Sequence, residues 1–245
     1  MYLNKFIFMT KITTIIAAGG LGTRLIGYKG NDSTKMLLKI NNSSMIYHQI
    51  NQLIGWGLND FVIVTNPSYD KMIKEDVADK FPDVDMKFVT QKKQLGVAHA
   101  LQQAEQLIPK NSTVLYILGD NFFEYPQIDK KFLNEIQENE SYLFTKEVNN
   151  PKEFGVVEIN KQKVVSIIEK PKKPKSNLIA VGLYLFPSDC FEKFKYIQPS
   201  GRGEYEITSL LEIYMQSNYL NYREVKGWWV DAGTPEAIKK IEKLI

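Results

Sequence analysis

The sequence is poor in the residues from which disulfides and zinc sites are built. Its 245 residues include one cysteine, Cys190, and two histidines, His48 and His99. A single cysteine cannot form an internal disulfide, so we expect a protein of a reducing compartment, the cytoplasm. These three side chains also fall short of the ligand set of a structural zinc site. Cys190 lies among apolar residues, and we interpret it as inert core packing.

Long apolar runs and a large excess of charge are also absent. No stretch approaches the ~20 apolar residues that span a bilayer, so no membrane association is expected. Residues 1–11 are interrupted by Lys5 and lead to no small-residue cleavage site, so we interpret them as an N-terminal extension, with Met9 as an alternative start. The formal net charge of +3 is too small to indicate a nucleic-acid partner.

Apolar strands alternate with amphipathic helices in the first half of the chain. We expect strands at 12–18, 60–65, 86–90 and 113–118, and helices at 44–54, 69–80 and 97–107. The last strand is expected to stop at Gly119-Asp120-Asn121. This order of elements predicts an α/β domain with a mainly parallel sheet.

The pattern changes after residue 121. We expect short strands at 142–148, 155–159, 164–169, 179–185, 222–226 and 228–231, with helices at 206–216 and 235–244. Neither a repeat nor a low-complexity linker separates the halves. The second half is therefore expected to be inserted into, or folded back on, the first.

A glycine cluster follows the first strand, in IIAAGGLGTRL at residues 15–25. Parallel sheets bind ligands at the carboxyl ends of their strands, where glycine N–H groups can cradle phosphate oxygens. The third glycine of a dinucleotide fingerprint and the Gly-Lys-Ser/Thr of a P-loop are both missing. Arg24 could hold a phosphate with two N–H groups. The alternative is a tight turn followed by a surface arginine.

Two aspartates stand at the ends of apolar strands, Asp120 in LGDN and Asp231 in WWVDAGT. Mg²⁺ prefers one or two carboxylates together with substrate phosphates. Two such carboxylates on one metal ion are the minimum for phosphoryl or nucleotidyl transfer. Each aspartate taken alone is also typical of a helix or turn cap.

Seven ordered motifs between about residues 12 and 241 together resemble the sugar-1-phosphate nucleotidylyltransferases. They are AAGGLGTRL, TKMLLKI, LGDN, FGVVE, EKPKKPKSN, GRGEYEIT and WWVDAGT. The resemblance implies a three-layer, Rossmann-like nucleotidyltransferase fold with a mainly parallel central sheet. It implies a nucleotide-binding part at 12–121 and an inserted sugar-phosphate-binding region at 122–245, in a homo-oligomer.

The resemblance also implies roles for individual residues. On the nucleotide side, the triphosphate would be wrapped by Gly19, Gly20, Gly22 and Thr23. Arg24 would bind its β and γ phosphates, and Lys35 would stabilise charge on the phosphates. The base would be contacted by Gln91 and Gly96. Asp120 and Asp231 would bind Mg²⁺.

On the sugar side, the resemblance implies that Asn121, Gly155, Glu169 and Val181 hold the sugar. Lys170 and Arg202 would hold its 1-phosphate, and Lys170 joins Arg24 and Lys35 as a catalytic cation. Two of the three arginines, Arg24 and Arg202, thus fall in these motifs. Taken alone, Glu169-Lys170-Pro171 is also typical of a charged strand end, and the Arg202 segment of a helix entry.

The implied reaction joins dTTP and α-D-glucose 1-phosphate to give dTDP-glucose and pyrophosphate. A sugar-phosphate oxygen attacks the α-phosphorus in line, so positioning and charge neutralisation suffice. UTP or CTP remains an alternative nucleotide. A non-catalytic sugar-nucleotide-binding regulator is a further alternative, but such a protein would be expected to lose Arg24, Lys35 or an aspartate.

The chain departs from the family pattern between Arg24 and Lys35. The segment LIGYKGNDST lacks the usual proline and is about one residue longer, so the loop over the triphosphate is expected to differ in shape. The chain also stops soon after residue 244. Longer members continue with a helical tail that helps to build a second, regulatory nucleotide site, so we expect weaker end-product control here.

Overall fold

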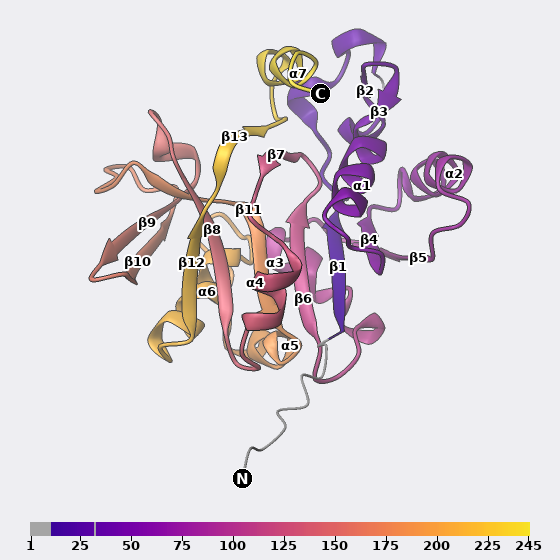
Figure 1. Cartoon of the computed structure of the whole chain (residues 1–245). Helices are drawn as coiled ribbons and strands as arrows, with labels where there is room; N and C mark the ends of the chain where they lie inside the picture. Colours follow the sequence, from indigo (N-terminus) through magenta and orange to yellow (C-terminus); the bar gives the residue numbers. More distant parts are fainter. Residues whose placement is uncertain (1–10, 32) are drawn as a thin grey trace.

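The computed structural model describes residues 11–31 and 33–245 and confirms the α/β class. The centre of the sheet is parallel (Figure 1). Strand β1 (Ile12–Ala17) lies between β4 (Phe61–Thr65) and β6 (Thr113–Leu118), and β5 (Met86–Thr90) extends the sheet beyond β4. β1, β4 and β6 are mainly apolar or β-branched and largely buried because helices cover both of their faces, whereas the edge strand β5 carries Lys87 and is only partly buried. Of the predicted N-terminal extension, all but Lys11 lies outside the described residues.

The second half of the chain adds strands to the same sheet through β11 (Leu178–Pro187), which runs antiparallel to β6. β11 also pairs with β8 (Ser141–Glu147) and β9 (Gly155–Asn160). The outer strands are β10 (Lys163–Glu169), antiparallel to β9, and β12 (Leu220–Glu224), parallel to β8. One long strand therefore joins the strands of the second half to the central sheet.

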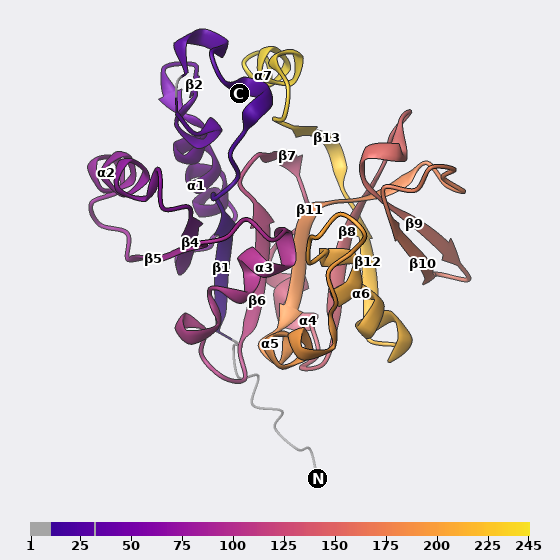
Figure 2. The same ribbon diagram turned by 180° about the vertical axis from the view of Figure 1, so that it is seen from behind.

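Helices pack on both faces of the sheet, so the domain has three layers (Figures 1 and 2). α1 (Met45–Gly55) and α2 (Asp70–Lys80) share one apolar core with Ile16 of β1. α3 (Val97–Gln102) and α6 (Ile207–Gln216) share the other core with Ile15. Neighbouring residues of β1 thus point into opposite cores, as the two-residue period of a strand requires.

Some predicted boundaries were wrong. The helix expected over 97–107 ends at Gln102, and the chain continues through i→i+3 hydrogen bonds into a 3₁₀ turn, η4 (Glu105–Leu107). The final helix α7 spans Pro235–Ile241 and ends before residue 244. Several short elements were not predicted: η1 (Thr23–Leu25), η2 (Tyr28–Gly30), η3 (Lys35–Leu37), β2 (Lys39–Ile40), β3 (Ser43–Ser44), α4 (Lys130–Glu135), η5 (Pro151–Glu153), α5 (Cys190–Lys193) and η6 (Phe194–Tyr196).

The segment after Gly119 is also not the simple stop that was predicted. A new strand, β7 (Asn121–Tyr125), begins there and pairs antiparallel with β13 (Lys226–Asp231). This small sheet lies above the carboxyl ends of β1 and β6 (Figure 1). Its register sets Asp231 opposite Asn121, so two motifs that are far apart in the sequence meet at one edge of the central sheet.

Candidate active site

The glycine loop after β1 packs closely against its neighbours. A Cβ on Gly19 would lie 3.1 Å from the Thr65 carbonyl oxygen at the end of β4. A Cβ on Gly22 would lie 2.7 Å from Cβ of Lys35, and the backbone of Gly22 is left-handed, with φ at +60°. Both space and conformation therefore require glycine at position 22. The loop crosses the carboxyl end of β1, as predicted for a phosphate cradle.

Lys35 forms an ion pair with Asp120, and both side chains are largely buried, with exposed fractions of 17% and 15%. Burial lowers the pKa of Lys35, but the neighbouring Asp120 carboxylate outweighs this and raises the pKa overall. For Asp120, burial raises the pKa, and Lys35 outweighs it and lowers the pKa. The two groups therefore stand as an ammonium and a carboxylate.

Asp231 completes this cluster from β13. The backbone N–H of Ala232 donates to the Asp120 carbonyl at 2.8 Å, which ties the two strand ends together. Burial and the nearby Asp120 carboxylate raise the pKa of Asp231 to about 7, against the opposing charges of Lys35 and Arg24. The two predicted metal ligands thus lie close enough to perturb each other, although 111 positions separate them in the sequence.

The pair fits a hard divalent cation by the chemistry of its donors. A carboxylate whose pKa is raised by burial and by a second carboxylate beside it also favours a dication between the two. Among residues 11–31 and 33–245, no cluster of three or more His, Cys, Asp or Glu side chains forms a metal site. Further oxygen ligands would therefore have to come from phosphate or water, which is the usual situation for Mg²⁺.

Asn121 forms hydrogen bonds next to this cluster and is almost completely buried, with 2% exposed. Its Nδ2 donates to Oδ1 of Asp120 at 3.0 Å. Its Oδ1 accepts from the Gly182 N–H at 3.0 Å and from Trp229 Nε1 at 2.8 Å. The resemblance implies that Asn121 contacts the sugar, whereas the structure shows an amide that also holds Asp120 to β11 and β13.

Arg24 and Thr23 lie at the open side of the glycine loop, where both side chains are exposed at the start of η1. Arg24 is near enough to Asp231 and Lys35 to act on the pKa of both. Gly20 faces Lys35, since a Cβ there would lie 3.5 Å from Cε of Lys35. The predicted triphosphate-binding residues are therefore neighbours in space.

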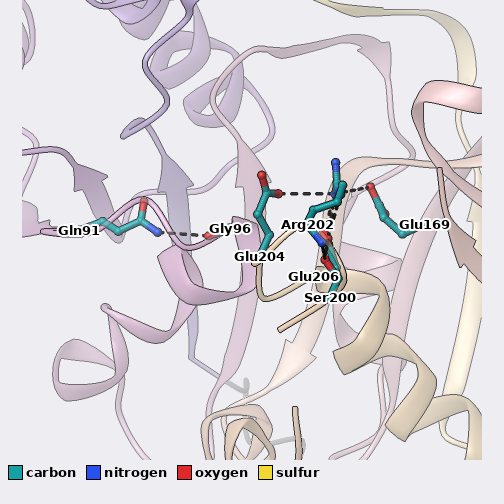
Figure 3. Close-up of polar contacts among 7 residues, drawn as sticks. All are labelled: Gln91, Gly96, Glu169, Ser200, Arg202, Glu204 and Glu206. Atoms are coloured by element: carbon teal, nitrogen blue, oxygen red, sulfur yellow. Dashed lines mark hydrogen bonds and ion pairs between the residues drawn. The ribbon is translucent and has the colours of Figure 1, made fainter. Parts of the chain in front are cut away.

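Gln91 extends the site along the sheet edge, beyond β5 (Figure 3). Its Nε2 donates to the Gly96 carbonyl oxygen at 3.1 Å and lies 2.9 Å from Nδ1 of His99. Its Oε1 faces Gly19, at 3.5 Å from a Cβ built there. Burial lowers the pKa of His99, which favours the neutral ring that can accept at Nδ1. The amide oxygen of Gln91 is therefore turned toward the glycine loop.

Gly96 joins this loop to the GRGEYEIT motif. Its φ is +103°, and a Cβ there would lie 2.7 Å from the Tyr205 carbonyl oxygen. Backbone hydrogen bonds run from Tyr205 N–H to the Leu95 carbonyl, at 2.7 Å, and from Ala98 N–H to the Tyr205 carbonyl, at 3.0 Å. The predicted base-binding loop and the predicted phosphate-binding segment are thus one connected piece of structure.

A cleft opens on the other side of Asp231. It contains the predicted sugar-binding side chains from β9, β10 and the GRGEYEIT segment. Its lining includes Asn121, Glu153, Phe154, Gly155, Glu169, Lys170, Gly182, Tyr184, Arg202, Glu204, Glu206, Trp229 and Asp231. Asp231 therefore borders both this cleft and the Lys35–Asp120 cluster.

The residues expected to hold the sugar differ in their exposure. Gly155 and Glu169 are register partners in β9 and β10, and Oε2 of Glu169 would lie 3.5 Å from a Cβ on Gly155. Burial, followed by the nearby Glu206 carboxylate, raises the pKa of Glu169. Lys170 is exposed and has a left-handed backbone, with φ at +42°. Val181 is fully buried, backbone included, and unlike the other residues expected to hold the sugar it does not line the cleft.

Arg202 is surrounded by carboxylates. Its Nη2 lies 2.8 and 2.9 Å from the two oxygens of Glu206, and 3.5 Å from both Glu169 and Glu204 (Figure 3). Burial lowers the pKa of Arg202, but these carboxylates, Glu206 first, raise it overall. The sequence indicated a phosphate-binding arginine and gave no signal for this network.

Comparison with known proteins identifies the family. A family model described as nucleotidyl transferase matches residues 13–245. The chain belongs to this family. Glucose-1-phosphate thymidylyltransferase of Neisseria meningitidis is 34% identical over 94% of this chain and 81% of its own length. UTP–glucose-1-phosphate uridylyltransferase AglF of Haloferax volcanii is 30% identical over 94% and 95%. The predicted resemblance to nucleotidyltransferases is confirmed.

Solved structures confirm the predicted fold. A candidate glucose-1-phosphate thymidylyltransferase from Bacillus anthracis, in complex with sucrose, matches with a TM-score of 0.85 and 32% identity, over 96% of this chain and 95% of that one. UDP-glucose pyrophosphorylase complexed with UDP-glucose matches with a TM-score of 0.81. Its 22% identity supports the shared fold alone. In the part of this nucleotidyltransferase that the structure describes, no helix is both long and apolar enough to cross a membrane.

Proposed function

We propose that the protein joins dTTP and α-D-glucose 1-phosphate to give dTDP-glucose and pyrophosphate. The observation that carries this proposal is the position of Asp231. Its carboxylate interacts with Asp120 and Lys35 beneath the glycine loop, and it also lines the cleft that contains Glu169 and Arg202. A nucleotide over the loop and a sugar phosphate in the cleft would therefore meet at this residue.

The proposed chemistry needs no protein nucleophile. An ionised oxygen of the sugar phosphate forms a bond to the α-phosphorus, and the bond from that phosphorus to the bridging oxygen of pyrophosphate breaks on the opposite side. Because two polyanions must approach each other, catalysis comes from positioning and charge. Arg24 and Lys35 would supply this charge to the triphosphate, and Lys170 to the sugar phosphate. Arg202 could join Lys170 once its contacts with Glu206 open.

We propose Asp120 and Asp231 as the residues that hold Mg²⁺. The ion would supply positive charge to the reacting phosphates when it is bound. Asn121 would keep the Asp120 carboxylate oriented through its 3.0 Å hydrogen bond. All four charged residues that a non-catalytic relative would be expected to lose, Arg24, Lys35, Asp120 and Asp231, are present, which supports an enzyme over a regulator.

The orientation of Gln91 supports a nucleotide with thymine or uracil. Its amide nitrogen donates to the Gly96 carbonyl and lies 2.9 Å from His99 Nδ1, which accepts in the tautomer that carries its proton on Nε2, and this leaves the amide oxygen for a ligand. Thymine and uracil offer an N3–H donor to such an oxygen, whereas cytosine presents an acceptor there. A site that leaves a buried polar group unpaired discriminates strongly. CTP is therefore the least favoured of the three pyrimidine nucleotides.

UTP is the second candidate nucleotide. It is favoured by the 30% identity to the Haloferax uridylyltransferase over almost the whole of both chains. The Gln91 amide offers the same contact to thymine and to uracil. Selection between dTTP and UTP must therefore depend on contacts with the 5-methyl group of thymine or with the 2′-hydroxyl group of UTP. The homo-oligomeric state and the cytoplasmic location also remain predictions.

A nucleotide panel tests the proposal. The purified protein is incubated with Mg²⁺, glucose 1-phosphate and one of dTTP, UTP or CTP, and both pyrophosphate and the nucleotide sugar are quantified. We expect the highest kcat/KM with dTTP and the lowest with CTP. A higher kcat/KM with UTP than with dTTP would make UTP the nucleotide substrate in place of dTTP. Absence of nucleotide sugar with every triphosphate would reject the enzymatic proposal.

A further inference from the structure

The Lys35–Asp120 ion pair occupies one of the two proposed metal ligands. Lys35 Nζ contacts Oδ2 of Asp120, and Asn121 Nδ2 donates to Oδ1 at 3.0 Å. Both oxygens of the carboxylate are thus engaged by protein donors. Each oxygen keeps a second lone pair, but the positive charge of the Lys35 ammonium balances the Asp120 carboxylate and repels a divalent cation that approaches it.

The lysine is built into this position. Its stem packs on the bare Cα of Gly22, since a Cβ there would lie 2.7 Å from Cβ and 2.9 Å from Cγ of Lys35. At the start of η3, the Thr34 hydroxyl accepts from the Met36 N–H and lies 3.4 Å from the Gly20 carbonyl. The backbone before Lys35 is therefore tied to the glycine loop, and the side chain is directed across that loop at Asp120.

The same geometry places the ammonium beside the proposed triphosphate site. Cε and Nζ of Lys35 would lie 3.5 and 3.8 Å from a Cβ on Gly20. A triphosphate cradled by this loop would offer the ammonium a new anionic partner within a short side-chain movement. Oδ2 of Asp120 would then be free of the ammonium.

We propose that Lys35 acts as a positioning residue that closes the metal site of the nucleotide-free protein and opens it when a triphosphate binds. This inference rests on the proposed function. Nucleotide binding and divalent-cation binding at Asp120 are then coupled through one side chain, and by linkage each strengthens the other. The carboxylate pair should bind a free metal ion weakly, although its donors suit one.

Binding of Mn²⁺ alone, followed by electron paramagnetic resonance in the absence of nucleotide, tests the inference. Lys35→Met and Lys35→Gln remove the competing ammonium, and we expect each to bind Mn²⁺ about tenfold or more tightly than the wild type, because a largely buried ion pair no longer has to break. Lys35→Arg keeps a cation beside Asp120 and should bind as weakly as the wild type. Adding Asp120→Asn to Lys35→Met should abolish the gain.

Unchanged Mn²⁺ affinity in the two neutral variants would overturn the proposal. If neither variant folds, as judged by circular dichroism, the wild type alone decides. Binding of Mn²⁺ at micromolar concentration without nucleotide would also overturn it, because the site would then already be open. Formation of dTDP-glucose by the wild type is a separate measurement, so failure of the proposed function and failure of this coupling give different results.

Discussion

Arg202 donates three hydrogen bonds to the two carboxylate oxygens of Glu206, from Nη2 at 2.8 and 2.9 Å and from Nε at 3.2 Å. Glu206 is itself only 5% exposed and also accepts from the Ser200 hydroxyl at 2.6 Å. The guanidinium therefore balances a buried carboxylate and, through its longer contacts, the charges of Glu169 and Glu204. Arg202 therefore reduces the net negative charge of the cleft even when no sugar phosphate is bound.

Arg202→Ala should therefore damage both stability and substrate binding. We expect a loss of about 1–2 kcal/mol in the free energy of unfolding, less than for a fully buried pair because 39% of the guanidinium side chain is exposed. The KM for glucose 1-phosphate should rise, since unbalanced carboxylates repel the phosphate. Urea unfolding and steady-state kinetics measure the two effects.

Arg223→Ala is the matched control for this prediction. Its guanidinium lies 4.0 Å from the centroid of the Phe132 ring, away from the cleft, so it should lose a cation–π contact of about 0.5–1 kcal/mol with no change in KM. Equal KM values for Arg202→Ala and the wild type would show that Arg202 does not set the charge of the cleft.

Gln91→Leu should remove the discrimination against cytosine. The amide oxygen of Gln91 is the proposed acceptor for the N3–H of the base, so its loss should lower kcat/KM for dTTP by about 10- to 100-fold and leave the KM of the sugar phosphate unchanged. The ratio of kcat/KM for dTTP to that for CTP should fall. His99→Leu should act in the same direction by a smaller factor, because the Gly96 carbonyl still orients the amide.

Gln94→Ala provides the comparison for this nucleotide panel. Gln94 lies in the same loop and is exposed, with its Nε2 3.4 Å from the Gln91 carbonyl oxygen. It should keep the wild-type preference. A preserved ratio of dTTP to CTP in Gln91→Leu would remove Gln91 from base recognition.

The parts of the molecule that the sequence predicts well are those in which local pattern and burial agree. The runs at 12–18 and 113–118 are mainly apolar or β-branched because both faces of a central parallel strand are covered. The glycine loop and Asp120 follow directly from where these strands end. Helix 97–107 has a helical composition throughout, but its last turn tightens into η4 before Pro109, which cannot continue a helix.

Other features depend on contacts between distant segments. The strand β7 begins at Asn121, where Gly-Asp-Asn resembles a turn, and only its partner β13 makes it a strand. Its register brings Asp231 to Asp120, which no local periodicity encodes. The contacts of Arg202 with Glu206 and of Gln91 with His99 are local, four and eight residues apart. They were not predicted because these residue types are common on any surface.

Asp231→Asn should stabilise the metal-free protein at alkaline pH while abolishing Mg²⁺-dependent turnover. The pKa of Asp231 is raised from its ordinary value of 3.8 to about 7, so the folded state binds this proton more tightly than the unfolded state does. The stabilisation of the folded state by protonated Asp231 is therefore complete at low pH. It is lost as the pH rises from 3.8 to about 7. Asparagine does not ionise and has no such loss.

Thermal unfolding in EDTA at several pH values tests the direction of this pH dependence of stability. Near pH 8, the free energy of unfolding of the variant should be larger than that of the wild type by on the order of 2 kcal/mol. This difference should shrink as the pH is lowered toward 5. Adding Mg²⁺ with dTTP should raise the Tm of the wild type more than that of the variant. Parallel pH profiles for the two proteins would mean that Asp231 carries no raised pKa.

Gly22→Ala should reduce turnover through Lys35, and Gly27→Ala separates this effect from backbone strain. Both glycines have positive φ, +60° and +78°, so each substitution should cost about 1 kcal/mol of stability. A Cβ at position 22 meets the stem of Lys35 at 2.7 Å, whereas nothing lies within 4 Å of a Cβ at position 27. Only Gly22→Ala should therefore move the ammonium, and we expect kcat/KM for the nucleotide to fall about tenfold or more in this variant alone. If kcat/KM for the nucleotide fell equally in the two variants, the packing of Lys35 on the glycine loop would have no part in catalysis.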